Sequence, residues 1–337
     1  MKRLLVVTDA WEPQTNGVVT TLQSVIAHLP ALGFETSVVH PGLFATLPLP
    51  SYPEIRIARD PWKLERLLER HRPDTVHLAT EGPLGLWARR WLCRRGMRFT
   101  TSLHTKFPEY VNERVAMPLA VGYRYLRWFH RPSAAVLCTT ETHRRELESW
   151  GMRQLVVWGR GVDTERFRPR PRSPRLRPRL LYVGRVAAEK NIEAFLRLDL
   201  EADKIVVGDG PARADLQRRY PRVQWRGYRH GDALVAEYAD ADALVFPSRT
   251  DTFGLVMLEA MACGTPVAAH PVTGPLDVVE PGATGWLDAD LTAAVHGALR
   301  VDRAGCRTHA LAQDWQQVAE RMAAWLSGSD AAASAVA

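Results

Sequence analysis

The stretch PSRTDTFGLVMLEAMACGTP, residues 247–266, decides the fold of this chain. It lies between two apolar runs, 243–246 and 267–269, that predict buried strands. Thr252 is expected to cap a helix over 253–262, and the glycine and proline that follow this helix prevent its continuation. A strand, a loop, a helix and a second strand form the repeat of a doubly wound α/β sheet. The loop therefore lies where such sheets bind ligands and where backbone amides attract anions.

Two carboxylates bracket this loop, Asp251 and Glu259. Glu259 lies inside the expected helix, and helical side chains point back toward the helix N-terminus, so Glu259 can reach the same crevice as the loop. Its neighbours Val256, Leu258 and Met261 are apolar, which argues against a glutamate on a solvent-facing stripe. We therefore expect both carboxylates to face a ligand.

The same stretch resembles the signature of family 4 glycosyltransferases, which are retaining enzymes of the GT-B fold. That signature is E-x7-E followed by a helix of small residues and G-x-P-V, and here Asp251 stands in place of the first glutamate while Glu259 is the second. The resemblance implies that Glu259 holds the ribose of a nucleotide sugar and that Asp251 approaches the sugar hydroxyls. Aspartate is one methylene shorter than glutamate, so the preferred sugar stays open. The residues that the resemblance places against the sugar and phosphates are Thr252, Phe253, Gly254, Leu255 and Val256.

A second motif, which contains two cations, begins the C-terminal half. Here an expected strand over 180–183 is followed by Gly184 and Arg185, and Lys190 comes five residues later. Two cations beside a strand end and a helix N-terminus can stabilise a departing diphosphate without a metal ion. We expect Arg185 and Lys190 to be catalytic together with Asp251. The backbone positions that the resemblance places beside the nucleotide are Gly184, Gly208, Gly210, Gly227 and Tyr228.

Strands also alternate with helices through the N-terminal half, which predicts another parallel, doubly wound sheet. Asn16 and Gly17 form a loop between the first strand and a helix, and Gly17 matches the family's glycine loop over the donor phosphates. His104 follows a strand, in a segment Ser-Leu-His-Thr-x-Phe that resembles the family's acceptor-side histidine motif. We expect His104 to be catalytic and to lie on the acceptor side with Asn16 and Lys106.

Residues 108–130 mix aromatic side chains with arginines in one amphipathic segment. Such a helix can lie in a lipid interface. It can also pack on the core of the first domain, which we favour for most of its length.

The length and composition of the chain restrict the classes of protein to which it can belong. A length of 337 residues favours two domains, and 46% hydrophobic with 24% charged residues is ordinary for a globular protein. No apolar run reaches the roughly 18 residues of a transmembrane helix. The four cysteines are widely spaced and form no C-x-x-C pair, so a zinc site or disulfide framework is not expected and a reducing cytoplasm fits.

The net charge of +7 is unevenly spread. Residues 1–170 carry 25 Lys and Arg against 16 Asp and Glu, whereas the remainder carries 19 against 21. A basic N-terminal half suggests an anionic surface as partner, although an arginine-rich genome would produce the same bias.

We expect an acceptor-side domain at 1–167, a linker at 168–179 and a nucleotide-sugar-binding domain at 180–312. A helix at 313–327 should return to the first domain, and the tail at 328–337 should be disordered. The resemblance covers nearly the whole chain and implies two Rossmann-like doubly wound domains facing a central cleft.

The resemblance implies a retaining transfer of a hexose from GDP-mannose, a UDP-hexose or a UDP-hexuronate to an acceptor hydroxyl. We expect neither a metal ion nor a cofactor, because no Asp-x-Asp motif lies in a suitable loop. The acceptor is expected to be a membrane lipid such as diacylglycerol, with a cytoplasmic enzyme peripheral to the inner face of the membrane. Two alternatives stay open: a soluble or polysaccharide glycan as acceptor, and a protein that binds nucleotide sugars or anionic surfaces without transfer. No recognisable nucleic-acid module is present, so nucleic acid is not an expected partner.

Overall fold

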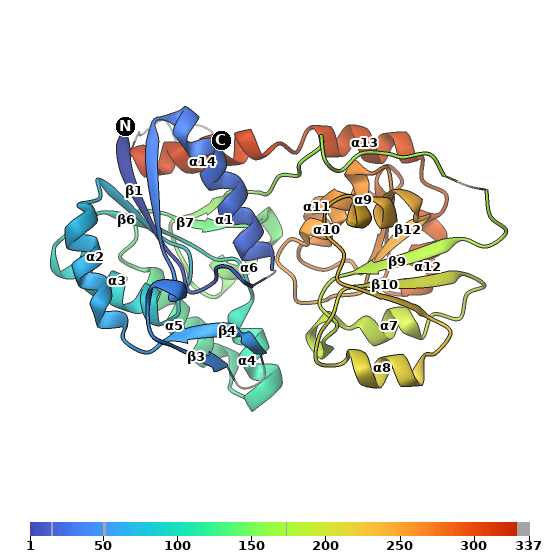
Figure 1. Ribbon diagram of the computed structural model, residues 1–337, viewed down its shortest axis with the longest axis horizontal. Helices are drawn as coiled ribbons and strands as arrows, with labels where there is room; N and C mark the ends of the chain where they lie inside the picture. The colour runs from blue at the N-terminus through green and yellow to red at the C-terminus, as the bar shows by residue number, and fades with distance from the viewer. Residues whose placement is uncertain (15, 50–51, 173, 329–337) are drawn as a thin grey trace. The chain divides into compact units, whose positions relative to one another are not determined.

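A computed structural model describes residues 1–14, 16–49, 52–172 and 174–328. The chain divides into two compact units: residues 1–159 with a C-terminal helix, and residues 160–314. Each unit holds a six-stranded sheet whose neighbouring strands all run parallel, with helices between successive strands (Figure 1). The expected α/β class with two doubly wound sheets is confirmed.

The sheet of the first unit has the order β2-β1-β5-β6-β7-β8. Its strands are β1 (Lys2–Val7), β2 (Phe34–Val39), β5 (Thr75–Leu78), β6 (Phe99–Ser102), β7 (Val136–Cys138) and β8 (Leu155–Val157). Its helices are α1 (Gly17–His28), α2 (Leu64–His71), α3 (Pro83–Arg94), α4 (Phe107–Val115), α5 (Leu119–His130), α6 (Glu141–Ser149) and α14 (Trp315–Ser327). An antiparallel hairpin, β3 (Thr46–Leu49) and β4 (Tyr52–Ala58), comes between β2 and α2 along the chain.

Alternate residues of the first sheet face different helices, as the two-residue period of a strand requires. Leu5, Val7, Val76 and Leu78 pack with residues of α2 and α3 in one core. The C-terminal helix α14 packs against α1, β5 and β6, so the end of the chain completes the first unit.

The sheet of the second unit has the order β11-β10-β9-β12-β13-β14. Its strands are β9 (Arg179–Val183), β10 (Asp203–Val207), β11 (Gln224–Gly227), β12 (Ala243–Phe246), β13 (Val267–Ala269) and β14 (Gly285–Leu287). Its helices are α7 (Ile192–Leu196), α8 (Arg213–Arg219), α9 (Gly231–Asp240), α10 (Leu255–Ala262), α11 (Pro275–Val278), α12 (Leu291–Ala298) and α13 (Arg303–Leu311).

Two apolar cores cover the faces of this second sheet. Leu181 and Leu244 pack with α9, α10 and α13 on one face, whereas Leu180 and Val245 pack with α7, α8 and α12 on the other. Along the chain the strand order reverses between β9 and β12. Open α/β sheets bind ligands at this reversal, outside the carboxyl ends of the strands.

Helix α10 begins later than the sequence suggests. It starts at Leu255, and its N-cap is Gly254 with a φ of +86°, so the expected cap at Thr252 is wrong. A Cβ at Gly254 would come within 2.8 Å of the Phe246 ring, and the turn therefore needs glycine in a left-handed conformation. Thr252 is instead buried in the loop.

The expected single helix over 108–130 is also wrong, because the segment forms two helices, α4 and α5. Ala116 adopts a left-handed conformation with a φ of +51° and ends α4. Pro118 restricts the residue before it to extended backbone, so the helix cannot continue and α5 begins at Leu119.

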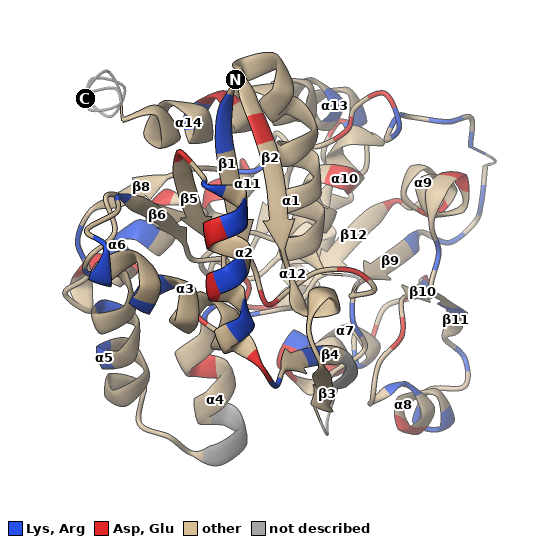
Figure 2. Cartoon of the chain, turned by 60° about the vertical axis from the view of Figure 1, so that its left-hand side comes forward, with Lys and Arg blue, Asp and Glu red and all other residues tan. Residues whose placement is uncertain are grey.

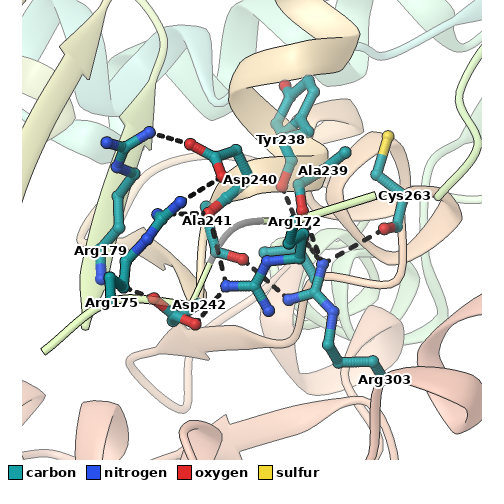
Figure 3. Close-up of polar contacts among 11 residues, drawn as sticks. Arg172, Arg175, Arg179, Tyr238, Ala239, Asp240, Ala241, Asp242, Cys263 and Arg303 are labelled. Atoms are coloured by element: carbon teal, nitrogen blue, oxygen red, sulfur yellow. Dashed lines mark hydrogen bonds and ion pairs between the residues drawn. The ribbon is translucent and has the colours of Figure 1, made fainter. Parts of the chain in front are cut away.

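Residues 168–179, expected as the linker, lie within the second unit and are held to it by arginines. Arg172 pairs with Asp242, and both Arg175 and Arg179 pair with Asp240, at the point where α9 passes into β12 (Figure 3). Arg303 adds hydrogen bonds to the backbone carbonyls of this corner. Much of the positive charge in this segment is therefore matched by aspartates.

Candidate functional site

The residues that the sequence predicts to bind the donor lie at the carboxyl edge of the second sheet, where the loops after β9 and β12 meet. Lys190 Nζ lies 2.5 Å from Asp251 Oδ1. Asn191 Nδ2 donates to the Pro247 carbonyl at 3.1 Å, and Thr250 Oγ1 donates to the Glu189 carbonyl at 3.2 Å. Three side chains thus bridge the two loops at the reversal of strand order, and they bring Lys190 and Asp251 together.

The Lys190–Asp251 pair leaves one carboxylate oxygen for a ligand. Both side chains are about one-fifth exposed, at 22% and 20%. Asp251 Oδ2 is buried and has no hydrogen-bond partner among the described residues. A buried acceptor without a partner is costly, and a hydroxyl group from a ligand would satisfy it.

Glycines shape the loops after β9 and β10 by allowing close backbone approach. A Cβ at Gly208 would lie 1.9 Å from the Gly184 carbonyl oxygen, and one at Gly210 would lie 2.4 Å from that of Val186. Gly184 and Gly227 also have positive φ values, +153° and +67°. These four glycines have a structural reason to be present, independent of any contact with a nucleotide.

Arg185 follows Gly184 directly after β9, and its backbone carbonyl accepts a hydrogen bond from the Tyr182 hydroxyl at 2.7 Å. Its side chain is partly exposed at the same edge of the sheet. Tyr228 follows β11, is 54% exposed and stacks on His230 with ring centroids 6.1 Å apart. Phe253, Leu255 and Val256, the remaining positions of the expected loop, are partly exposed around the N-terminus of α10.

Glu259 is held by a tyrosine that the sequence did not reveal. The hydroxyl of fully buried Tyr238 on α9 donates to Glu259 Oε2 at 2.6 Å. Burial raises the pKa of the Glu259 carboxyl above its ordinary value, while the Tyr238 hydrogen bond and the charge of Arg166 oppose this rise. Tyr238 therefore both orients the carboxylate and favours its ionised form.

The sequence predicts that Glu259 holds the ribose of a nucleotide, and on this expectation Tyr238→Phe should make nucleotide binding more sensitive to acid. Without the tyrosine hydroxyl, the pKa of Glu259 rises further, so the carboxyl keeps its proton to a higher pH. An ionised carboxylate accepts hydrogen bonds with both oxygens, whereas a protonated one loses part of this capacity. Calorimetric titration with GDP across mildly acidic to mildly alkaline pH should show affinity falling at a higher pH in the variant. Superimposable pH profiles for the two proteins would show that Tyr238 has no such role.

The first unit places Asn16 and Gly17 at the start of α1. Asn16 is its N-cap, and the side-chain oxygen accepts hydrogen bonds from the amides of Val18 and Val19 at 3.0 and 3.1 Å. The amide side chain thus has a capping function that explains its presence. Gly17 is the first residue of the helix, at the carboxyl edge of the first sheet.

Asp9 is a partly buried carboxylate at the reversal of strand order between β1 and β5, and the sequence did not single it out. It accepts hydrogen bonds from the Thr80 hydroxyl at 2.8 Å and from the amides of Leu84 and Gly85 in the first turn of α3. Burial raises its pKa, and these hydrogen bonds counteract the rise. Asp9 is thus explained by its capping of α3.

His104 lies two residues after β6, and its ring is positioned by buried neighbours. Ser102 Oγ lies 2.8 Å from His104 Nε2, and the Trp158 ring meets the imidazole edge-on with centroids 5.8 Å apart. Trp158 is fixed in turn, because its indole nitrogen donates to the Val318 carbonyl of α14 at 3.0 Å. Lys106 is paired with Glu146 of α6 at 2.7 Å, and its side chain is only 10% exposed.

Among the described residues, no group of three or more His, Cys, Asp or Glu side chains is placed to hold a metal ion. The cysteines in this part of the chain are free thiols. No described helix has the length and apolar character needed to cross a bilayer.

Comparisons with known proteins agree with the fold. Residues 15–166 match the family described as Glycosyltransferase Family 4, and residues 177–301 match that described as Glycosyl transferases group 1. The chain is 31% identical to a GDP-mannose-dependent alpha-mannosyltransferase of Mycolicibacterium smegmatis, over 95% of this chain and 96% of the relative. It is 26% identical to a GDP-mannose-dependent alpha-(1-6)-phosphatidylinositol dimannoside mannosyltransferase of Mycobacterium tuberculosis, over 96% of each. Sucrose-phosphate synthase from Thermosynechococcus elongatus has a similar structure, with a TM-score of 0.77 and 21% identity over 96% of this chain and 97% of that one.

Proposed function

The chain belongs to glycosyltransferase family 4, and from this premise we propose that it transfers mannose from GDP-mannose to a hydroxyl group of a membrane lipid. The enzyme is a retaining hexosyltransferase that uses a nucleotide sugar. The observation that carries the donor site is the Lys190–Asp251 pair with its unpartnered Asp251 oxygen, at the reversal of strand order. GDP-mannose is proposed because relatives that align over nearly the whole chain use it by name. A UDP-hexose or UDP-hexuronate remains the alternative donor.

In this proposal the second unit binds and activates the donor. Glu259 accepts hydrogen bonds from the ribose, and Asp251 Oδ2 accepts one from a sugar hydroxyl. Arg185 and Lys190 then stabilise the negative charge that builds on the diphosphate as the bond to the sugar breaks. The departing phosphate oxygen accepts the proton of the acceptor hydroxyl, which attacks from the same face and so retains the configuration. The side chains proposed for this role require no metal ion.

The lipid acceptor is supported by one face of α5. This helix buries Tyr123, Leu126 and Phe129, while Val121 and Trp128 remain 54% and 51% exposed. Three arginines along α5 and at its end are also exposed: Arg124, Arg127 and Arg131. Figure 2 shows Lys and Arg positions on the α5 ribbon in blue. Arginine and tryptophan on one face of a helix suit the interface of an anionic membrane.

The first unit is also basic when charges are counted over the residues that the structure assigns to it rather than over residues 1–170. Residues 1–159 and 315–337, which form this unit, carry 22 Lys and Arg against 16 Asp and Glu. Arg89 lies 4.0 Å from the centre of the Trp128 ring and adds a further cation to the exposed α5 face. Each basic residue near an anionic membrane contributes about 1 kcal/mol of attraction.

Reversing the charge of the α5 face should weaken membrane binding. We expect Arg124→Glu with Arg131→Glu to reduce binding to anionic vesicles at least tenfold, because each lost cation removes about 1 kcal/mol and each new carboxylate adds repulsion. The matched control is Arg218→Glu with Arg222→Glu, which reverses two exposed arginines of the second unit. Flotation with anionic and neutral vesicles at low salt measures the effect.

Two results would defeat the lipid proposal. One is wild-type protein that ignores anionic vesicles at low salt and transfers sugar to soluble glycans but not to diacylglycerol or a glycolipid. The other is an equal loss of vesicle binding in both variant pairs. A soluble or polysaccharide acceptor would then be favoured, whereas nucleotide-sugar binding without any transfer would favour the non-enzyme alternative.

A further inference from the structure

The strand β6 carries three consecutive buried hydroxyl residues, Thr100, Thr101 and Ser102, each no more than 2% exposed. Buried hydroxyls need partners, and histidines supply them on both faces of the strand. Thr101 points to one face and meets His130 Nδ1 at 2.8 Å. Thr100 and Ser102 point to the other face, where they meet the ring of His77 on β5.

On that second face a continuous chain of hydrogen bonds runs to His104. His77 is fully buried, with Nδ1 2.9 Å from Thr100 Oγ1 and Nε2 3.0 Å from Ser102 Oγ. Ser102 Oγ lies a further 2.8 Å from His104 Nε2. Trp158 packs edge-on against both imidazoles, with centroid distances of 6.2 Å to His77 and 5.8 Å to His104. One serine hydroxyl therefore joins the Nε2 atoms of two histidines.

We propose that Ser102 and His77 are positioning residues for His104, because the shared hydroxyl forces the two imidazoles into complementary tautomers. Ser102 has a single proton and can donate it to only one of the two Nε2 atoms. The other Nε2 must then carry its own proton and donate it to the serine oxygen. If both imidazoles donated, the serine proton would lack a partner, since the described residues offer Ser102 Oγ no other acceptor.

Two arrangements satisfy the chain, and each sets which nitrogen of His104 carries the proton. In one, Thr100 donates to His77 Nδ1, His77 Nε2–H donates to Ser102, and Ser102 donates to His104 Nε2. His104 then carries its proton on Nδ1. In the other, His77 Nδ1–H donates to Thr100, Ser102 donates to His77 Nε2, and His104 Nε2–H donates to Ser102. Protonation of His104 requires the second arrangement, so a change at His104 also switches the tautomer of His77.

The surroundings keep His77 neutral in both arrangements. Burial, together with a smaller effect of the nearby His130, lowers the pKa of His77 to about 3. Asp74, three residues before His77, is paired with Arg3, and Glu81, four residues after it, lies 3.3 Å from His130 Nε2. Lys106, near His104 in the chain, is paired with Glu146. A neutral imidazole has one donor and one acceptor nitrogen. The hydrogen-bond chain from Thr100 through His77 and Ser102 to His104, here called the relay, requires one of each from His77.

The relay deepens the proposed function, because it rests on His104 acting at the acceptor hydroxyl. A histidine that orients such a hydroxyl must present a defined donor or acceptor to it. Ser102 and His77 would determine which nitrogen of His104 is the donor and which is the acceptor, although neither residue touches the substrate. Their effect on transfer should therefore fall on kcat, whereas the KM for the donor should stay unchanged.

Nitrogen-15 NMR of the full chain labelled at histidine tests the relay directly, since the nitrogen shifts separate the two neutral tautomers. His77→Gln and His104→Gln assign the signals. The wild type should show His77 and His104 as opposite tautomers. Ser102→Ala should abolish this relation and lower kcat about tenfold, and Ser102→Thr, which keeps the hydroxyl, should restore both. Circular dichroism checks that each variant is folded.

Thr101→Val is the matched control, because it removes a buried hydroxyl from the same strand but on the opposite face. It should alter the signals of His130 and leave those of His104 unchanged. The proposal is overturned if the His104 nitrogen shifts are the same in Ser102→Ala as in the wild type, or if Thr101→Val changes them equally. A failure of the proposed function would look different: the wild type would transfer no sugar, while the NMR result would still decide on the relay.

Discussion

We expect Arg185→Ala to lower the turnover of sugar transfer by about a hundred- to a thousandfold while the fold survives. The loss of one preorganised donor to developing negative charge is worth roughly 3–4 kcal/mol of barrier. Arg185 lies two residues after the end of β9, and the Tyr182 hydroxyl donates a hydrogen bond to its backbone carbonyl, so the residue is held at the edge where the diphosphate is proposed to bind. The side chain is only partly exposed, which limits screening of its charge by water.

Steady-state kinetics with a matched surface variant measure this loss. Arg218→Ala removes an exposed arginine from α8 in the same unit and should leave turnover unchanged. Thermal unfolding of both variants separates a catalytic effect from a loss of folded protein. If Arg185→Ala turns over at a rate near that of the wild type, Arg185 has no part in stabilising the leaving group.

Glu259→Ala and Asp251→Ala should impair different steps. Removal of Glu259 should weaken binding of free GDP about ten- to a hundredfold, because hydrogen bonds to a charged group are worth roughly 1.5–3 kcal/mol. Removal of Asp251 should leave GDP affinity largely intact and reduce sugar transfer, because its unpartnered oxygen is proposed to contact the sugar rather than the nucleotide. This variant would also remove the ion pair between Lys190 and Asp251, whereas Lys190 would keep its charge for the diphosphate.

Calorimetric titration with GDP and with GDP-mannose distinguishes the two roles. The Asp251 variant should lose the extra affinity that the sugar provides, whereas the Glu259 variant should lose affinity for both ligands. Glu259→Gln and Asp251→Asn keep the side-chain shape and test the need for charge. Equal losses of GDP affinity in both alanine variants would refute this division of roles.

The fold and the edges of both sheets could be predicted from the sequence because they depend on local patterns. Short apolar runs such as 243–246 and 267–269 formed the expected strands β12 and β13. Gly184, Gly208 and Gly227 each follow or end a strand, so the edge at which we propose that the donor binds could be predicted from strand ends alone. The helix start at Leu255 was missed because the Gly254 conformation depends on the Phe246 ring, which packs beside it.

The contacts that tune the site could not be predicted, because they join residues distant in the chain. Tyr238 and Glu259 belong to different helices, and His77 and Ser102 to different strands. Only the folded sheet sets β5 beside β6 and pairs His77 with Thr100. The signal in the sequence was a histidine inside an apolar strand and a Thr-Thr-Ser run inside another strand. Such buried polar side chains need hydrogen-bond partners, but the sequence does not identify which residues these are.

NMR of the product formed from GDP-mannose and vesicles containing diacylglycerol or a mannosylated glycolipid tests most directly whether this family 4 enzyme is a lipid mannosyltransferase. We predict equal amounts of GDP and an α-mannoside, formed in the presence of EDTA and lost in Arg185→Ala. UDP-glucose and UDP-glucuronate in parallel reactions should give no product. Hydrolysis of GDP-mannose without a new glycoside, a β-linked product, or transfer from a UDP-sugar alone would contradict the proposal.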